Sequence, residues 1–247
     1  MGAALAAATV LAQIAYPLVR GDARDTLTVA TVLLFAATSL AHARVSRGPR
    51  AAALLLLVAG GGGLLAEAVG VATGVPFGRY YYAGSLGPAV LGVPVVIPLA
   101  WVMMAWPAYL VAARLARRGP GRVAVGAAAL ASWDLFLDPQ MVDAGHWRWA
   151  DPLPSLPGVP TVPLTNYAGW LLVALVLMTL LDRAVPVRPG RDTVPYALYL
   201  WTYASSVLAH AAFLGLPASA LWGGLGMGLV AVPLALALRR PAPLVLG

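Results

Sequence analysis

Apolar runs about as long as a membrane is thick dominate this chain of 247 residues. A helix needs roughly 20 mainly apolar residues to cross about 30 Å of hydrocarbon. Eight such runs follow one another, near 3–19, 26–43, 51–74, 88–113, 123–142, 166–181, 195–216 and 218–238. Only 10% of the residues are charged, whereas about 25% are charged in a soluble domain. The sequence therefore predicts an all-α, polytopic bundle of transmembrane helices that forms a single integral membrane domain over 1–247.

The arginines predict the orientation of this bundle. All 16 basic residues are arginines, and 12 of them follow the second, fourth and sixth runs or lie in the C-terminal tail. Because basic linkers stay in the cytoplasm, we expect both termini there, in a multi-pass protein of the cell membrane. Eight spans fit this orientation, because an even number of crossings returns the chain to the side where it began. Little more than Pro217 separates the last two runs, so seven spans or a re-entrant hairpin are alternatives. Since the arginines are spread between apolar runs, membrane lipids are the expected partners and nucleic acid is not.

Carboxylates inside the apolar runs are the most informative polar residues. A charge at the centre of a membrane helix costs about 2.5–3.5 kcal/mol on insertion scales, so such a residue is a functional candidate. Six acidic residues fall in linkers or at run ends, where solvated charges are expected: Asp22, Asp25, Asp143, Asp151, Asp182 and Asp192. The other three are Glu67, Asp134 and Asp138. The helical rise puts Glu67 and Asp138 at a similar depth in the outer half of the bilayer, and Asp134 shares a helix face with Asp138.

Small residues and a proline surround these carboxylates. Gly63, Gly70 and Gly74 lie on the helix face of Glu67, where they let a flat group or another helix approach. Pro139 has no N–H for the carbonyl of Leu135, so the fifth run is expected to kink or end there. The freed carbonyl is a natural place to hold a water molecule. Without further information, the three carboxylates fit a polar network between helices, a proton or ion path, or a catalytic site.

Two linkers on the predicted outer face are rich in aromatic residues. One spans 74–82 and the other 143–151, and an arginine accompanies the aromatic side chains in each. An interfacial aromatic belt explains single Trp or Tyr residues, whereas the two clusters together favour a cap over a site. Similar Gly-Val-Pro turns follow at 92–94 and 158–160. The third and fourth runs therefore form a candidate repeat of the fifth and sixth.

Several kinds of chemistry find no support in the sequence. The chain has no cysteine, which removes thiolate ligands and cysteine nucleophiles. No set of His, Asp and Glu residues has the spacing of a metal site, and no phosphate-binding loop or dinucleotide fingerprint is present. We therefore expect neither a metal nor another cofactor. His42 and His210 are expected to be packed or hydrogen-bonded between helices.

The order of these residues resembles a known family, the membrane proteins of carotenoid biosynthesis typified by carotenoid 1,2-hydratases and bisanhydrobacterioruberin hydratases. The resemblance covers about 65–182. It is carried by Glu67, 74–82, 86–88, 92–94, 97–101, 103–104, Asp134, 138–142, 145–149, 163–167 and 169–170. Outside this core the chain is similar only in its hydrophobicity.

The resemblance implies the addition of water to the terminal isoprenoid double bond of an acyclic or monocyclic carotenoid, without a cofactor. A carboxyl group in apolar surroundings keeps its proton near neutral pH and can protonate the alkene. We expect Asp138 to be the general acid and Glu67 and Asp134 to act as base and water-holding partners, although these roles can be exchanged. Expected substrate-binding residues are Arg79, Tyr80, Tyr82, Trp101, Trp133, His146, Trp147, Asn166 and Trp170, and Arg79 is a candidate ion-pair partner for a carboxylate.

Three other functions compete with hydration. A transporter or proton channel needs a polar path through both leaflets, whereas the carboxylates cluster on one side. A carotenoid-binding protein without activity would tolerate their loss. A cyclase-type end-group enzyme is the closest rival, because cyclisation also begins with protonation.

In addition, Gly224 and Gly228 form a small-residue face for helix packing within the chain or between subunits of a homo-oligomer.

Overall fold

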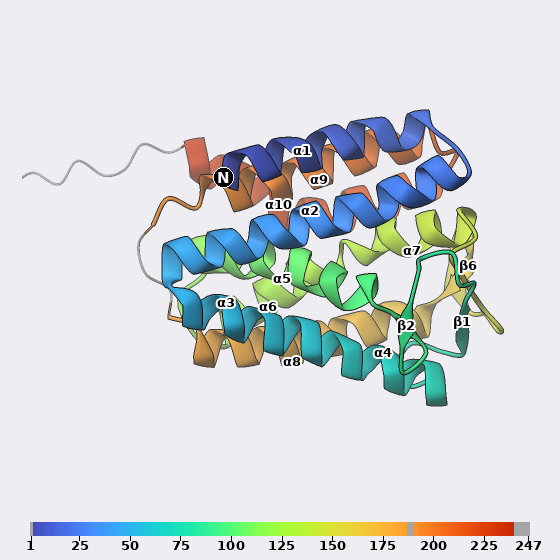
Figure 1. Cartoon of the computed structure of the whole chain (residues 1–247), viewed down its shortest axis with the longest axis horizontal. Helices are drawn as coiled ribbons and strands as arrows, with labels where there is room; N and C mark the ends of the chain where they lie inside the picture. Colours follow the sequence, from blue (N-terminus) through green and yellow to red (C-terminus); the bar gives the residue numbers. More distant parts are fainter. Residues whose placement is uncertain (1, 187–189, 240–247) are drawn as a thin grey trace, which may run out of the picture.

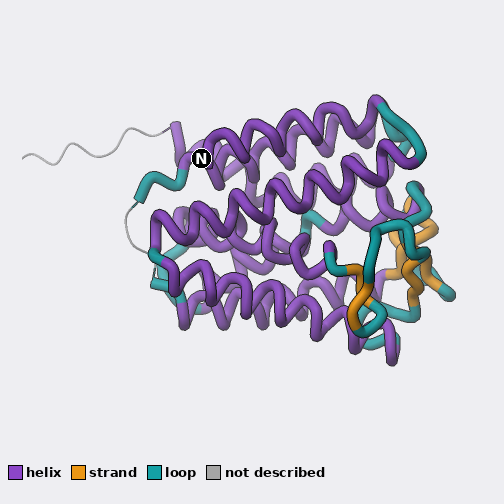
Figure 2. Tube along the Cα trace, viewed as in Figure 1, coloured by secondary structure: helices purple, strands orange, loops and turns teal. Residues whose placement is uncertain are grey.

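The computed structural model of the protein describes residues 2–186 and 190–239. Long helices form a bundle, and short strands gather at one end of it (Figures 1 and 2). The helices are α1 (Gly2–Ala15), α2 (Asp22–Arg47), α3 (Pro49–Leu55), α4 (Gly62–Thr73), α5 (Val96–Leu115), α6 (Pro120–Ala131), α7 (Asp134–Asp143), α8 (Leu164–Ala184), α9 (Thr193–Ala212) and α10 (Pro217–Arg239). The strands are β1 (Tyr80–Tyr82), β2 (Ala89–Val90), β3 (Val93–Pro94), β4 (Trp147–Trp149), β5 (Ser155–Leu156) and β6 (Val159–Pro163).

Helices occupy the predicted apolar runs. A π-helical turn, Leu56–Gly61, joins α3 to α4, so the chain is helical from Pro49 to Thr73. Among the described residues, five helices are long and apolar enough to cross a membrane: this one, α2, α5, α8 and α10. The prediction of a mainly helical chain with several helices of membrane length is thus confirmed, whereas the six short strands were not expected. The number of spans and the side on which the termini lie stay predictions.

The arginine-rich connections gather at one end of the bundle. The α2–α3 and α5–α6 connections and the C-terminal ends of α8 and α10 lie opposite the strands (Figure 1). At this end, Arg122 binds Asp182 with a distance of 3.1 Å between nitrogen and oxygen, and Arg47 binds Asp192 at 2.7 Å. The expectation of solvated charges at these two aspartates was wrong. Both are buried, because arginines on neighbouring helices supply the partners that a buried carboxylate needs.

The small-residue face of α10 packs inside the chain. A Cβ atom on Gly228 would lie 2.9 Å from the hydroxyl oxygen of Tyr203, and one on Gly224 would lie 3.6 Å from Val207. Both neighbours belong to α9. These glycines therefore account for close packing between α9 and α10.

The fifth predicted run is interrupted before Asp134 and not at Pro139. A turn at Ser132 and Trp133 separates α6 from α7, and α7 continues through Pro139 to Asp143. Of the two expected outcomes at Pro139, an end of the helix is therefore wrong, and a kink stays a prediction. The hydroxyl of Ser219 on α10 donates to the carbonyl of Leu135 at 2.7 Å, which replaces the bond that proline cannot make. A side chain thus occupies the position where a water molecule was expected.

The two aromatic linkers pair with each other. β1 and β4 are antiparallel, with Tyr80 opposite Trp149 and Tyr82 opposite Trp147. The hairpin β2–β3 then leads into α5, and the hairpin β5–β6 leads into α8. The order of helix, strand, hairpin and helix therefore occurs twice, starting from α4 and from α7, in agreement with the expected repeat.

Candidate active site

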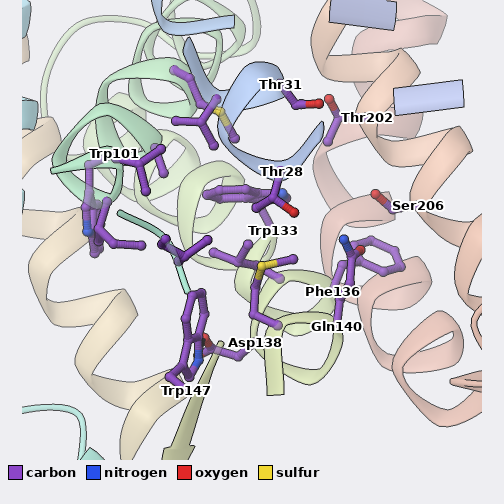
Figure 3. A pocket seen from close by; sticks show the side chains of 18 of the residues that line it. Thr28, Thr31, Trp101, Trp133, Phe136, Asp138, Gln140, Trp147, Thr202 and Ser206 are labelled. Carbon is purple, nitrogen blue, oxygen red and sulfur yellow. Dashed lines mark hydrogen bonds between the residues drawn. The ribbon is translucent and has the colours of Figure 1, made fainter. Parts of the chain in front are cut away.

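A cavity lies at the strand end of the bundle, with about 1240 Å³ of empty space when the solvent at its opening is included. Helices α1, α2, α4, α5, α7, α8 and α9 and strands β1 and β4 all contribute to its wall. Most of the wall is aromatic or aliphatic, and Figure 3 shows Trp101, Trp133, Phe136 and Trp147 around it. Glu67 and Asp138 line this mainly apolar cavity from α4 and α7.

Glu67 accepts three hydrogen bonds from aromatic side chains. The hydroxyl groups of Tyr80 and Tyr82 donate to its Oε2 at 2.5 and 2.9 Å, and Trp101 Nε1 donates to its Oε1 at 3.1 Å. Burial raises the pKa of the Tyr80 and Tyr82 phenols, which lie in the linker outside the helices. Both phenols therefore stay protonated and act as donors. Three donors suit a charged carboxylate, which only accepts hydrogen bonds.

Glycines on the Glu67 face make these contacts sterically feasible. A Cβ atom on Gly63 would lie 2.6 Å from Cγ of Trp101, and one on Gly70 would lie 2.8 Å from Phe77 and 3.1 Å from the Tyr80 hydroxyl. Real Cβ atoms do not come this close to a ring. The flat groups expected beside Glu67 are therefore the Trp101 indole and the Phe77 and Tyr80 rings.

Asp134 and Asp138 form a pair bridged by one amide. The Nδ2 group of Asn166 donates to Asp134 Oδ2 at 2.7 Å and also to Asp138 Oδ2. Trp147 Nε1 donates to Asp138 Oδ1 at 3.0 Å. The Oδ1 atom of Asp134 is buried and has no hydrogen-bond partner among the described residues. Asp138 faces the cavity, whereas Asp134 lies behind the cavity wall.

Aromatic rings connect the two carboxylate groups. Trp101 stacks on Trp170 with a centroid distance of 4.0 Å, and Trp133 meets Trp170 edge-on at 6.0 Å. Tyr82 packs edge-on against Trp147 at 5.7 Å. Such rings present electron-rich faces that attract a cation.

Most of the predicted site residues share this cavity. Those on its wall are Glu67, Asp138, Tyr80, Tyr82, Trp101, Trp133, Trp147, Asn166 and Trp170. Arg79 and His146 are not among the lining residues. Arg79 is exposed, and none of the ion pairs among the described residues includes it, so the expected pairing with a carboxylate is absent. His146 is buried and its Nδ1 lies 2.8 Å from the Ser85 hydroxyl, which ties the second linker to the first.

Part of the cavity wall comes from helices that the sequence did not connect with the site. Tyr16 follows α1, Thr31 lies on α2 and Thr202 on α9, and all three line the cavity. The signal available in the sequence was a hydroxyl group within an apolar run. That signal is weak, because Ser and Thr in helices commonly bond to a carbonyl of the preceding turn.

Apolar helices of membrane length around a cavity that carries buried carboxylates define this chain as a membrane protein with an acidic internal site. The chain belongs to the carotenoid biosynthesis protein family, whose model matches residues 27–233. It is also similar to the bisanhydrobacterioruberin hydratase of Haloarcula japonica, with 37% identity over 121 residues. That alignment covers 47% of this chain and 40% of the relative, so the chain spans less than half the length of the curated relative it matches. No solved structure matches the chain significantly.

Proposed function

We propose that the protein is a carotenoid hydratase, a cofactor-independent hydro-lyase that adds water to a terminal isoprenoid double bond. One observation carries the proposal: Glu67 and Asp138 line the same aromatic cavity in different hydrogen-bonding environments. The family supports a role in carotenoid biosynthesis, and the hydratase relative supports the reaction class. We further propose that the protein resides in the cell membrane with eight spans and both termini in the cytoplasm.

The different environments support one distribution of the acid and base roles. Glu67 accepts from three donors, which stabilises its charged form and suits a base. Asp134 and Asp138 accept from the same Asn166 amide, and two carboxylates this close in dry surroundings hold one proton between them. Because Asp138 is the member of the pair on the cavity wall, it is the general acid. Asp134 is a positioning residue that shares the proton.

The reaction then balances in three steps. The O–H bond of Asp138 breaks, and its proton forms a C–H bond at the less substituted alkene carbon as the π bond opens. The oxygen of a water molecule forms a C–O bond to the resulting tertiary cation. The protonated alcohol gives a proton to Glu67, and return of a proton from Glu67 to the aspartate pair restores the starting state. The net change is alkene plus water to tertiary alcohol.

The aromatic wall stabilises the cation between the first two steps. Ring faces attract a desolvated cation by about 2 kcal/mol or more, and the stacked Trp101 and Trp170 with the edge-on Trp133 supply such faces. The same rings give a carotenoid end group an apolar surface. An indole also cannot remove a proton from the cation as a carboxylate does, so the wall leaves the cation available to water.

The test is the carotenoid profile of a lycopene-producing host with and without this chain. We expect the wild type to add one water, 18 mass units, to one or both ends, whereas Asp138→Asn and Glu67→Gln lose at least about a hundredfold in product, the lower range for removal of an acid or base. Asp143→Asn is the matched control, because Asp143 ends the same helix and is exposed. Undiminished product from both cavity variants contradicts the proposal. A product of unchanged mass but altered retention identifies a cyclase instead.

A further inference from the structure

One side of the cavity is lined by hydroxyl groups from helices outside the carboxylate elements. Tyr16, Thr31 and Thr202 are such residues of the cavity wall. Figure 3 shows Thr31 on α2 and Thr202 on α9 extending toward one another, across the view from Asp138 and Trp147. This part of the wall therefore differs in chemistry from the aromatic part around the carboxylates.

These three hydroxyl groups are buried and none forms a hydrogen bond of normal length and angle with the described residues, although the side chains of Thr28 and Gln140 lie near that of Tyr16. Threonines elsewhere in the same helices behave differently: the hydroxyl of Thr9 donates to the Leu5 carbonyl at 2.9 Å, and that of Thr38 to the Leu34 carbonyl at 2.8 Å. Leaving a buried hydroxyl unpaired costs about 1–3 kcal/mol. Three residues that line one cavity and come from three segments carry such groups, which indicates a ligand that forms hydrogen bonds.

Water fits this position better than hydrocarbon does. A hydrocarbon chain offers nothing to a hydroxyl group, whereas a buried water forms 2–4 hydrogen bonds to polar groups that otherwise lack partners. The cavity has the room, because the centre of a water molecule can occupy about 150 Å³ of it, whereas one buried water needs about 10–15 Å³. We propose that Tyr16, Thr31 and Thr202 hold bound water, and that this water is the reactant for the hydration site. The second half of the inference rests on the proposed function.

The binding of water can be tested without any activity. In radiolytic footprinting of the purified full-length chain, X-rays turn bound water into hydroxyl radicals that oxidise the side chains beside it. We expect Tyr16, although only 8% exposed, to be oxidised at least about fivefold faster than Tyr199, whose hydroxyl is paired with the Ala129 carbonyl. The double variant Thr31→Val/Thr202→Val removes two of the three polar groups and should bring the Tyr16 rate down to that of Tyr199.

A matched control keeps this result interpretable. The double variant Thr9→Val/Thr38→Val removes two buried hydroxyl groups that bond within their own helices, and it should leave Tyr16 oxidation unchanged. A wild-type Tyr16 rate equal to that of Tyr199 overturns the water site. So does a Thr31→Val/Thr202→Val variant that melts higher than the wild type, because a dry site gains stability when unpaired hydroxyl groups are removed.

The supply of reacting water needs a second measurement, in membranes suspended in D₂O. A cation that finds no water loses H⁺ from the carbon that was deuterated or from a neighbouring methyl group, and either path leaves deuterium at the former alkene CH. We expect Thr31→Val/Thr202→Val to lower the ratio of hydrated product to deuterated alkene about tenfold, and the control pair to leave it unchanged. If Thr31→Val/Thr202→Val loses the fast oxidation of Tyr16 but keeps the wild-type ratio of hydrated product to deuterated alkene, the bound water is not the reactant. If the wild type makes no hydrated product, the proposed function fails while the footprint still decides the water site.

Discussion

Glu67 and Asp138 stand on different helices, yet each accepts a hydrogen bond from one strand of the same β pair. Tyr80 on β1 donates to Glu67, and Trp147 on β4 donates to Asp138. Because the two strands are hydrogen-bonded to each other, the pair fixes the positions of both carboxylates relative to the cavity. The short sheet is therefore a positioning element as well as a cap over the bundle.

Gly63 is expected to be essential for the Trp101 contact with Glu67. In Gly63→Ala the new Cβ would lie 2.6 Å from Trp101 Cγ, so the indole must move away from the carboxylate. Overpacking of this kind costs about 1–3 kcal/mol. We expect a lower melting temperature in detergent and at least a tenfold loss of hydrated product, roughly 1.4 kcal/mol in the barrier.

The neighbouring Gly61 provides the control. A Cβ at that position would meet only Leu57, at 3.9 Å, so Gly61→Ala should keep both the stability and the product yield of the wild type. If Gly63→Ala and Gly61→Ala have the same melting temperature and product yield, the close contact of Trp101 with Gly63 is not needed for stability or activity.

Ser219 and Pro139 are expected to be coupled through the Leu135 carbonyl. Ser219→Ala removes the hydroxyl that donates to this carbonyl at 2.7 Å and should cost about 1–3 kcal/mol. Pro139→Ala restores a backbone N–H that can donate to the same oxygen. In the Pro139→Ala background the Ser219→Ala penalty should therefore shrink by about 0.5–1.5 kcal/mol. Melting curves of the four proteins measure this coupling, and strictly additive effects would contradict it.

The sequence was sufficient to predict where most helices lie and most of the side chains that the structure brings together around the cavity. Apolar runs of membrane length located the helices, because a chain that crosses lipid needs about 20 apolar residues and must pair its backbone polar groups within a helix. The cost of an acidic residue in such a run singled out Glu67, Asp134 and Asp138. Helical rise alone then placed Glu67 and Asp138 at one depth, and the structure has both on one cavity.

What the sequence did not predict depends on contacts between distant helices. The burial of Asp182 and Asp192 depends on Arg122 and Arg47, and the continuation of α7 past Pro139 depends on Ser219. The contribution of Tyr16, Thr31 and Thr202 to the cavity likewise requires α1, α2 and α9 to meet. No local pattern encodes such pairs, so these features appear only in the folded chain.

Tyr80 should influence stability at alkaline pH. Burial raises its pKa above the usual value of about 10, so the folded protein keeps a proton that the unfolded chain loses. The free energy of unfolding should therefore fall as the pH rises above about 10, with about 1.4 kcal/mol per pH unit from this residue. Tyr80→Phe should reduce the slope by that amount, measured by thermal melting between pH 9 and pH 11. Tyr81→Phe, exposed on the same strand, should retain the wild-type slope.

The absence of cysteine from the sequence makes the membrane topology directly measurable, because each introduced cysteine is then the single thiol. Arg117 is exposed at the arginine-rich end of the bundle, and Asp151 and Phe213 are exposed at the strand end. With both termini in the cytoplasm, an impermeant maleimide added to intact cells should label Asp151→Cys and Phe213→Cys but not Arg117→Cys. Lysed cells should show labelling of all three. Labelling of Arg117→Cys in intact cells would reverse the orientation, and protection of Phe213→Cys alone would show that α9 and α10 form a re-entrant hairpin and do not cross.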